Sequence, residues 1–285
     1  MTRKSLFHFA LVGLLWGIPY LLMKVAVEDF PPAAVVAGRT LIGASILIPI
    51  AIYRKKFGGA VLGFKYVAFY ALMEMIGPWI LITTAEQKIN SGLAGLLVST
   101  VPIFATIITS LRGDHSVWQF KRVFGIVVGF IGLILVVGIE SLSGNSDPLS
   151  IAMAIVASMG YAYAVIMVTS NLPLVDGIAI NGLAMAITTV FWAPVAIAQW
   201  PSSISMNSAL SLIALGVFST AIAFILFFKV MAEIGPARSS LVTYLNTAIA
   251  VLLGVIILRE PLTVGIIVGL PMVLVGSYLA SKKTT

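Results

Sequence analysis

Ten long apolar runs, separated by short polar breaks, make up most of the chain. A hydrocarbon core about 30 Å thick requires about 20 apolar residues of α-helix, and each run has about that length. The runs are continuous, and each is about twice as long as the roughly ten residues of a barrel strand. The pattern therefore predicts ten transmembrane helices. They are expected at about 5–26, 33–53, 64–86, 92–111, 119–139, 149–170, 178–199, 208–230, 237–258 and 262–281.

Composition supports a membrane protein and removes several kinds of site. Of the 285 residues, 60% are hydrophobic and 9% are charged, with a mean hydropathy of +1.11. These values indicate an all-α integral membrane protein without a separate soluble domain. The sequence has no cysteine, and its two histidines, His8 and His115, are far apart. We therefore expect no disulfide, no metal site and no cofactor.

The net charge of +7 is explained by topology rather than by a nucleic-acid partner. If the N-terminus is cytoplasmic, 13 of the 17 basic residues fall in cytoplasmic segments. Acidic residues such as Glu28, Glu86 and Glu260 then collect at the outer ends. An excess of Lys and Arg on the cytoplasmic side sets orientation in membranes. Both termini are predicted to be cytoplasmic.

Weak internal similarity divides the chain into two halves. The segment "INSGLAGLLVSTVPIFATI" from Ile89 aligns with "IGPARSSLVTYLNTAIAVL" from Ile234 at an offset of 145, which also pairs Trp16 with Tyr161. Five helices per half is an odd number, so the second half enters the membrane from the opposite side. We predict two inverted five-helix repeats, residues 1–140 and 147–285.

Small and polar residues form stripes along the fourth and ninth predicted helices. Ser99 lies on the first stripe, and Asn246 lies on the second, near the middle of the membrane. Such residues either let helices pack closely or line a solute cavity. A buried carboxamide needs hydrogen-bond partners in either case. We assign both residues to a cavity wall and keep helix packing as the alternative.

Two charged residues lie within predicted spans rather than at their ends. Arg39 is expected to have a scaffold role, with Glu86 or the polar end of the third helix as a possible partner. Glu74 is the carboxylate placed near mid-depth. It either meets the ammonium group of a solute or titrates to couple export to protons, and a structural carboxyl is the alternative.

Aromatic residues are candidate walls of a cavity near the middle of the membrane. Most membrane aromatics pack or lie at the interface. Trp16 and Tyr161 matter more, because the repeat pairs them at similar depth. The full set of predicted binding residues is Trp16, Tyr20, Glu74, Trp79, Ser99, Tyr161, Tyr163, Tyr244 and Asn246.

The segment "STAIAFILFFKVMAEIGPARSSLVTYLNTAIAVLLGVIILREPLT", Ser219 to Thr263, resembles the second EamA domain of the drug/metabolite transporter superfamily. Its "IGPA", "YL" and "EPLT" match the family pattern, but Thr247 stands where a proline is usual. "LLWGIPYLLMK" and "PPAAVVAGRTLIGA" resemble the first domain. The resemblance implies ten helices in two inverted repeats and export of small metabolites. Among these transporters, the sequence resembles bacterial amino-acid exporters of the YddG-like kind.

Three function classes were weighed. The polar stripes near mid-depth and the absence of a phosphate-binding loop favour a secondary transporter. The sequence has no filter-like segment, as a channel would need. It also has no nucleophile paired with a base, as an enzyme would need. We predict an exporter of small amphipathic solutes, most readily amino acids, in the bacterial inner membrane. The alternative is a proton-coupled exporter of drugs or other metabolites. The sequence leaves the oligomeric state open.

Overall fold

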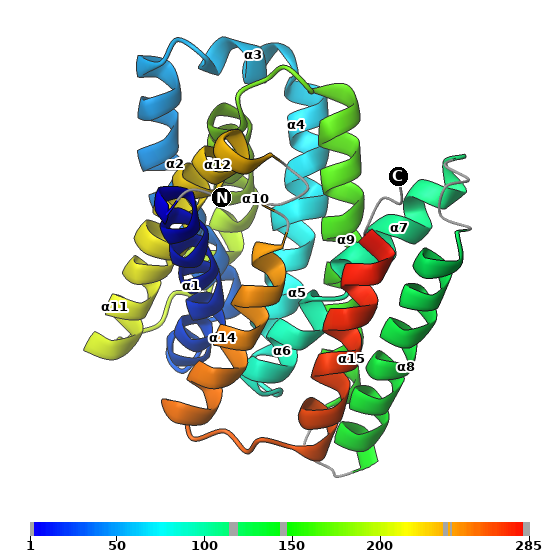
Figure 1. The fold of residues 1–285 in the computed structure, drawn as a ribbon. Helices are drawn as coiled ribbons and strands as arrows, with labels where there is room; N and C mark the ends of the chain where they lie inside the picture. The colour runs from blue at the N-terminus through cyan, green and yellow to red at the C-terminus, as the bar shows by residue number, and fades with distance from the viewer. Residues whose placement is uncertain (1–2, 114–118, 143–146, 236–238, 240, 282–285) are drawn as a thin grey trace.

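The computed structural model describes residues 3–113, 119–142, 147–235, 239 and 241–281, and its regular elements in these ranges are helical (Figure 1). The elements before residue 143 are α1 (Arg3–Ala26), α2 (Pro32–Tyr53), α3 (Phe57–Leu62), α4 (Phe64–Ala71), η1 (Leu72–Ile76), α5 (Gly77–Ala85), α6 (Ser91–Val98), α7 (Val101–Leu111) and α8 (Phe120–Leu142). Those after residue 146 are α9 (Pro148–Asn171), α10 (Gly177–Ala198), α11 (Met206–Ala214), η3 (Leu215–Ile222), α12 (Ala223–Ile234), α14 (Val242–Ile256) and α15 (Val264–Ser281).

Seven helical segments of the described ranges are long and apolar enough to cross a membrane, judged by length and composition. They are Arg3–Ala26, Pro32–Tyr53, Phe64–Ala85, Ser91–Leu111, Pro148–Asn171, Gly177–Ala198 and Met206–Ile234. Two further apolar helices, α14 and α15, are shorter. The chain is therefore a helical, multi-pass membrane protein.

Local sequence signals set several helix ends. Asp147 and Asp176 precede α9 and α10, and each carboxylate accepts hydrogen bonds from backbone amides of the first turn. Such caps satisfy N–H groups that have no partner within the helix. Gly235, with φ of +82°, ends α12 in a backbone conformation that other residues rarely adopt.

Small residues allow the closest helix contacts. α15 packs along α8, as Figure 1 shows in red and green. A Cβ atom added at Gly132 of α8 lies 2.7 Å from Cβ of Met272 in α15. α2 packs against α10, and α1 packs against α14. These pairs join helices from before residue 143 to helices from after residue 146.

The two ends of the bundle differ in what they carry. α3 lies at one end, where Gly59 and Gly63 approach Val175 and Leu172 of the α9–α10 turn. We call this the α3 end. The opposite end holds the α1–α2 turn, the start of α6 and Glu260, and we call it the Glu260 end. α1 therefore runs towards the Glu260 end and α9 towards the α3 end (Figure 1).

Three predicted spans differ in detail from the helices. The fourth, expected as one helix, is divided into α6 and α7 at Ser99 and Thr100, directly before Pro102. The third and eighth contain the π-helical turns η1 and η3. The start of the ninth expected span lies partly outside the described residues. Proline removes a backbone donor, which explains the first division.

Candidate functional site

Arg39 of α2 is buried in the bundle, with 6% of its surface exposed. Its Nε and Nη2 atoms donate hydrogen bonds to Oγ1 of Thr220 in η3, at 3.3 and 3.2 Å. Its Nη1 atom lies 3.6 Å from the sulfur of Met23. The guanidinium carbon stands 3.9 Å from the centroid of the Trp79 ring. Hydroxyl, thioether and indole groups therefore surround this cation.

No carboxylate of the described residues reaches within salt-bridge distance of Arg39. The expected partner Glu86 contacts a different group, because the backbone carbonyl of Glu86 accepts a hydrogen bond from Nζ of Lys24 at 2.7 Å. The side chain of Glu86 is fully buried, and neither of its oxygens has a hydrogen-bond partner among the described residues. Arg39 thus carries a buried charge whose contacts are with neutral groups.

Tyr161 of α9 connects the two charged positions. Its side chain lies against Trp79 and close enough to Glu74, Tyr20 and Arg39 to sense their charges. Tyr20 of α1 is buried beside α6, where a Cβ atom added at Gly95 lies 3.5 Å from its ring. Three of the predicted residues, Tyr20, Trp79 and Tyr161, therefore lie around Arg39, and a fourth, Glu74, lies near Tyr161. We call these five residues and Thr220 the Arg39 cluster.

Glu74 lies in η1, and its Oε2 atom is buried without a hydrogen-bond partner in the described part of the chain. Pro78 follows four residues later and has no N–H, so the carbonyl of Glu74 lacks its usual helical donor. Single π-helical turns inside α-helices are frequent at functional sites. The second such turn, η3, holds Thr220 and a buried hydroxyl, that of Ser219, which also has no partner among the described residues.

The other predicted residues lie apart from the Arg39 cluster. Trp16 of α1 packs against Phe224 and Phe227, with ring centroids 5.6 and 4.6 Å away. Tyr163 packs against Phe69 and lines an apolar groove of about 470 Å³ between η1, α5, α7 and α9. Tyr244 faces Tyr278 of α15, with centroids 6.4 Å apart.

Ser99 and Asn246 lie near the contact of α6 with α14. The Ser99 hydroxyl donates to the carbonyl of Leu96 in its own helix, at 2.6 Å. Oδ1 of Asn246 accepts from Thr247 at 3.3 Å, and Thr247 also donates to the carbonyl of Gly95 in α6. In this conformation Thr247 of the second stripe joins α14 to α6.

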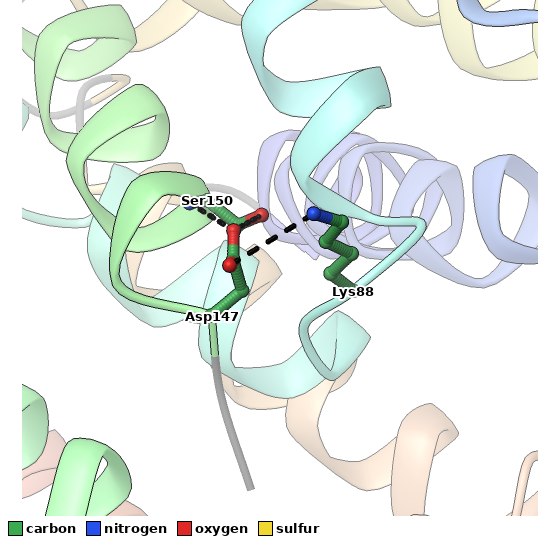
Figure 2. A network of polar contacts seen from close by, with 3 residues as sticks. All are labelled: Lys88, Asp147 and Ser150. Carbon is green, nitrogen blue, oxygen red and sulfur yellow. Dashed lines mark hydrogen bonds and ion pairs between the residues drawn. The ribbon is translucent and has the colours of Figure 1, made fainter. Parts of the chain in front are cut away.

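Polar contacts tie the Glu260 end together. Glu260 accepts hydrogen bonds from the amide and hydroxyl of Ser91, at 2.9 and 2.7 Å. Asp29 accepts from the Ser205 amide at 2.9 Å. Figure 2 shows Lys88 directed at Asp147, with Nζ and Oδ1 3.9 Å apart. Each contact joins a segment before residue 143 to one after residue 146.

Hydrogen bonds from serine residues lower the pKa of two aspartates at this end, Asp29 and Asp147. Hydrogen bonds from the side chain and amide of Ser205 hold the pKa of Asp29 below its ordinary value. Those from Ser150 do the same for the pKa of Asp147, as Figure 2 illustrates. Hydrogen bonds to the ionised form favour that form. Both groups therefore remain charged at neutral pH.

Sequence reasoning did not identify Thr220, Met23 and Ser219 as neighbours of the site. The available signal was the pair Ser219–Thr220 inside a long apolar run. An offset of 145 also pairs Glu74 with Ser219. The contact between Arg39 and Thr220 spans 181 residues of sequence, which no local pattern reveals.

Comparisons with known proteins agree on a transporter family. The profile of the EamA-like transporter family matches the sequence twice, over residues 3–138 and 148–282. The uncharacterized transporter YoaV of Bacillus subtilis is 27% identical, over 94% of this chain and 93% of its own. The uncharacterized inner membrane transporter YedA of Escherichia coli is 26% identical, over 95% of this chain and 90% of its own. Both relatives are similar over nearly their full length.

One solved crystal structure is similar in fold. It superposes with a TM-score of 0.65 and 16% identity, and the match covers 98% of each chain. At this level of identity the similarity concerns the fold alone.

Proposed function

The chain belongs to the EamA-like transporter family, and from this premise we propose that it is a secondary transporter that exports small amphipathic metabolites, foremost amino acids, by alternating access. One observation carries the proposal. Arg39 is a basic and Glu74 an acidic residue within the bundle, both lie near Tyr161, and no ion pair joins them. A solute with a positive and a negative end would complement both.

The proposed binding residues are those of the Arg39 cluster. The rings of Tyr20, Trp79 and Tyr161 would enclose the apolar part of a solute, and Glu74 would meet its ammonium group. Trp16 and Tyr163 border this region from α1 and α9. Ser99, Tyr244 and Asn246 would act at the contact of α6 and α7 with α14 and α15, which must rearrange when access alternates.

Helix boundaries support two repeats of five spans, residues 1–140 and 147–285. An offset of 145 carries the end of α1, Ala26, onto the end of α9, Asn171. The same offset carries both ends of α2 onto those of α10. It also places η1 within η3. The opposite directions of α1 and α9 support inversion of the second repeat, and with it a site between the halves.

We further propose that the α3 end faces the cytoplasm of a bacterium and that both termini lie on that side. Arg54, Lys55 and Lys56 lie beside α3, whereas Glu28, Asp29 and Glu260 lie at the opposite end. This distribution of Lys and Arg supports the orientation. The inner membrane is the proposed location, by analogy with the name of the relative YedA.

A second candidate function is proton-coupled export of drugs or other metabolites. The unpartnered Oε2 atom of Glu74 favours it, because a buried carboxyl without a fixed partner can exchange a proton as the site changes its exposure. The apolar groove beside η1 also accommodates a larger apolar group.

Counterflow in liposomes distinguishes the two functions. Purified protein is reconstituted, and uptake of labelled threonine, methionine and phenylalanine is measured with and without a proton gradient. Uptake without a gradient supports an amino-acid facilitator. Uptake that requires the gradient supports coupling through Glu74, which the Glu74→Gln variant then abolishes. Absence of uptake for all three solutes contradicts amino-acid export.

A further inference from the structure

The surroundings of Arg39 fix its charge in place without neutralising it. Burying a cation away from water costs free energy unless an opposite charge or several hydrogen bonds compensate it. Thr220, Met23 and the face of Trp79 are all neutral. The attraction between a cation and an indole face is smaller than the cost of burying a bare charge. An anion is therefore the group that this position lacks.

The hydrogen atoms of the guanidinium show where an anion would bind. Arginine has five N–H donors in a planar fork. Thr220 takes the Nε–H and one N–H of Nη2, and Met23 takes one N–H of Nη1. One N–H then remains on each Nη atom. Because Thr220 uses the edge between Nε and Nη2, the remaining N–H of Nη2 lies on the end of the fork, the edge at which Nη1 and Nη2 together bind two oxygens of a carboxylate.

The neighbouring groups favour a carboxylate over a phosphate. Tyr20 and Tyr161 lie close enough to Arg39 for their charges to interact, and their hydroxyl groups are further donors. Glu74, an acidic residue, also lies near Tyr161, which disfavours a group with two negative charges. A carboxylate carries one negative charge, and one guanidinium balances it.

From these contacts we propose that Arg39 binds the carboxylate of the transported solute, with Thr220 and Trp79 as positioning residues. This inference rests on the proposed export function and replaces the scaffold role expected for Arg39. The solutes are then molecules with a carboxylate beside an apolar group, and α-amino acids satisfy both Arg39 and Glu74. Because Arg39, Tyr20 and Trp79 precede residue 143 and Thr220 and Tyr161 follow residue 146, the site forms between the halves.

The test uses three solutes that differ in their end groups. Phenylalanine has both charged groups, phenylalaninamide lacks the carboxylate, and 3-phenylpropionate lacks the ammonium. Each competes against labelled phenylalanine in counterflow. For the wild-type protein we expect phenylalanine to compete at about 100-fold lower concentration than phenylalaninamide, the effect of removing one partner of a buried charged pair. Equal competition by the amide overturns the inference without recourse to any variant.

Variants identify the residue responsible. Arg39→Gln is expected to abolish the preference for the acid over the amide, and Arg39→Lys to keep part of it, because lysine retains the charge without the fork. Thr220→Val is expected to raise the KM for phenylalanine with little change for the amide. Unfolding temperature in detergent verifies that each variant is folded. A folded Arg39→Gln protein that still prefers the acid overturns the inference.

Failure of this inference differs from failure of the proposed function. If amino-acid counterflow occurs and phenylalanine competes no better than phenylalaninamide, the role of Arg39 is overturned and amino-acid export is still supported. Absence of amino-acid counterflow, combined with binding of 3-phenylpropionate that Arg39→Gln abolishes, overturns amino-acid export and supports the role of Arg39. Absence of 3-phenylpropionate binding as well as amino-acid counterflow overturns both.

Discussion

Glu260 caps the first turn of α6 from the other half of the chain, because its two carboxylate oxygens accept from the amide and the hydroxyl of Ser91. The amide of Gly92 approaches the same carboxylate at 3.4 Å. Helix N-termini attract negative charge, and their first amides need acceptors. Glu260, in the α14–α15 connection, thus supplies the acceptor that the first amide of α6 needs. This contact holds the two segments together at the Glu260 end.

Replacing Glu260 tests how much this contact contributes. Glu260→Ala leaves the Ser91 amide and hydroxyl without their acceptor, and we expect a loss of about 1–3 kcal/mol in the free energy of unfolding. Thermal unfolding in detergent measures it. Glu28→Ala is the matched control, since Glu28 is an exposed acidic residue in the neighbouring turn. Equal stability of the two variants would contradict a structural role for the cap.

A disulfide between α6 and α14 tests whether this contact must open. A Cβ atom built on Gly92 lies 3.7 Å from Cβ of Val251, within the range of about 3.5–4.5 Å that disulfides require. The native sequence has no cysteine, so Gly92→Cys/Val251→Cys introduces the only pair. We expect oxidation to stop counterflow and reduction to restore it. Each single-cysteine variant is a control, and full transport in the oxidised double variant would reject opening along this contact.

Glu74→Gln tests the partner of the solute's positive end. The amide keeps the shape of the side chain and removes its negative charge. We expect weaker competition by phenylalanine, on the order of tenfold, and unchanged competition by 3-phenylpropionate, which has no ammonium. Glu28→Gln serves as the exposed control. An equal loss for both solutes would show that Glu74 supports the fold instead of contacting the solute.

Packing of α8 against α15 predicts a sharp difference between two glycines. A Cβ atom at Gly276 would collide with the backbone of Gly129 and lie 2.7 Å from the carbonyl of Gly125. Gly276→Ala is expected to lower stability by about 1–3 kcal/mol, because the backbones must move apart. Gly58→Ala in α3 meets nothing within 4 Å and is expected to leave stability unchanged or raise it. Unfolding temperatures compare the two, and equal losses would argue against this close packing.

The capping carboxylate of Asp147 makes stability depend on pH. Hydrogen bonds from the side chain and amide of Ser150 lower the pKa of Asp147 in the folded protein. Its contribution is therefore complete above the unfolded-state pKa, near pH 4, and is lost as the pH falls through the lower folded value. Asp147→Asn removes this ionisation and keeps the cap. We expect its deficit in unfolding temperature at pH 7 to shrink as the pH falls below about 4 and to disappear below the folded pKa of Asp147. A deficit that stays constant as the pH falls through this range would contradict this account.

Much of the fold followed from the hydrophobic pattern. The second span was expected at 33–53 and the structure has Pro32–Tyr53, because the lipid core sets the length of apolar helix that the sequence must supply. Hydropathy is insensitive to local backbone geometry, so η1 and η3 were not predicted. The pattern also did not indicate the division at Ser99 and Thr100, although Pro102 was a visible signal.

The site was predicted in part and for a physical reason. Tyr20, Glu74, Trp79 and Tyr161 stand out because aromatic and charged residues are unusual at mid-depth; Tyr20, Trp79 and Tyr161 lie near Arg39, and Glu74 lies near Tyr161. Arg39 itself was assigned to a scaffold, because its role depends on which residues face it. Thr220 faces it from another helix, and helix rotation is decided by packing that one sequence does not show.

The π-helical turn η3 has a consequence for the angular register of its helix. A π turn contains more residues than an α turn, so the residues after it point in directions that an uninterrupted α-helix would not give them. Deleting one residue from Leu215–Ile222 would rotate the following segment by about 100° relative to the preceding one. If the segment before the deletion kept its contacts, the side chains after the deletion would turn away from theirs. The alignment of Thr220 with Arg39 therefore depends on the length of this turn as much as on the identity of either residue.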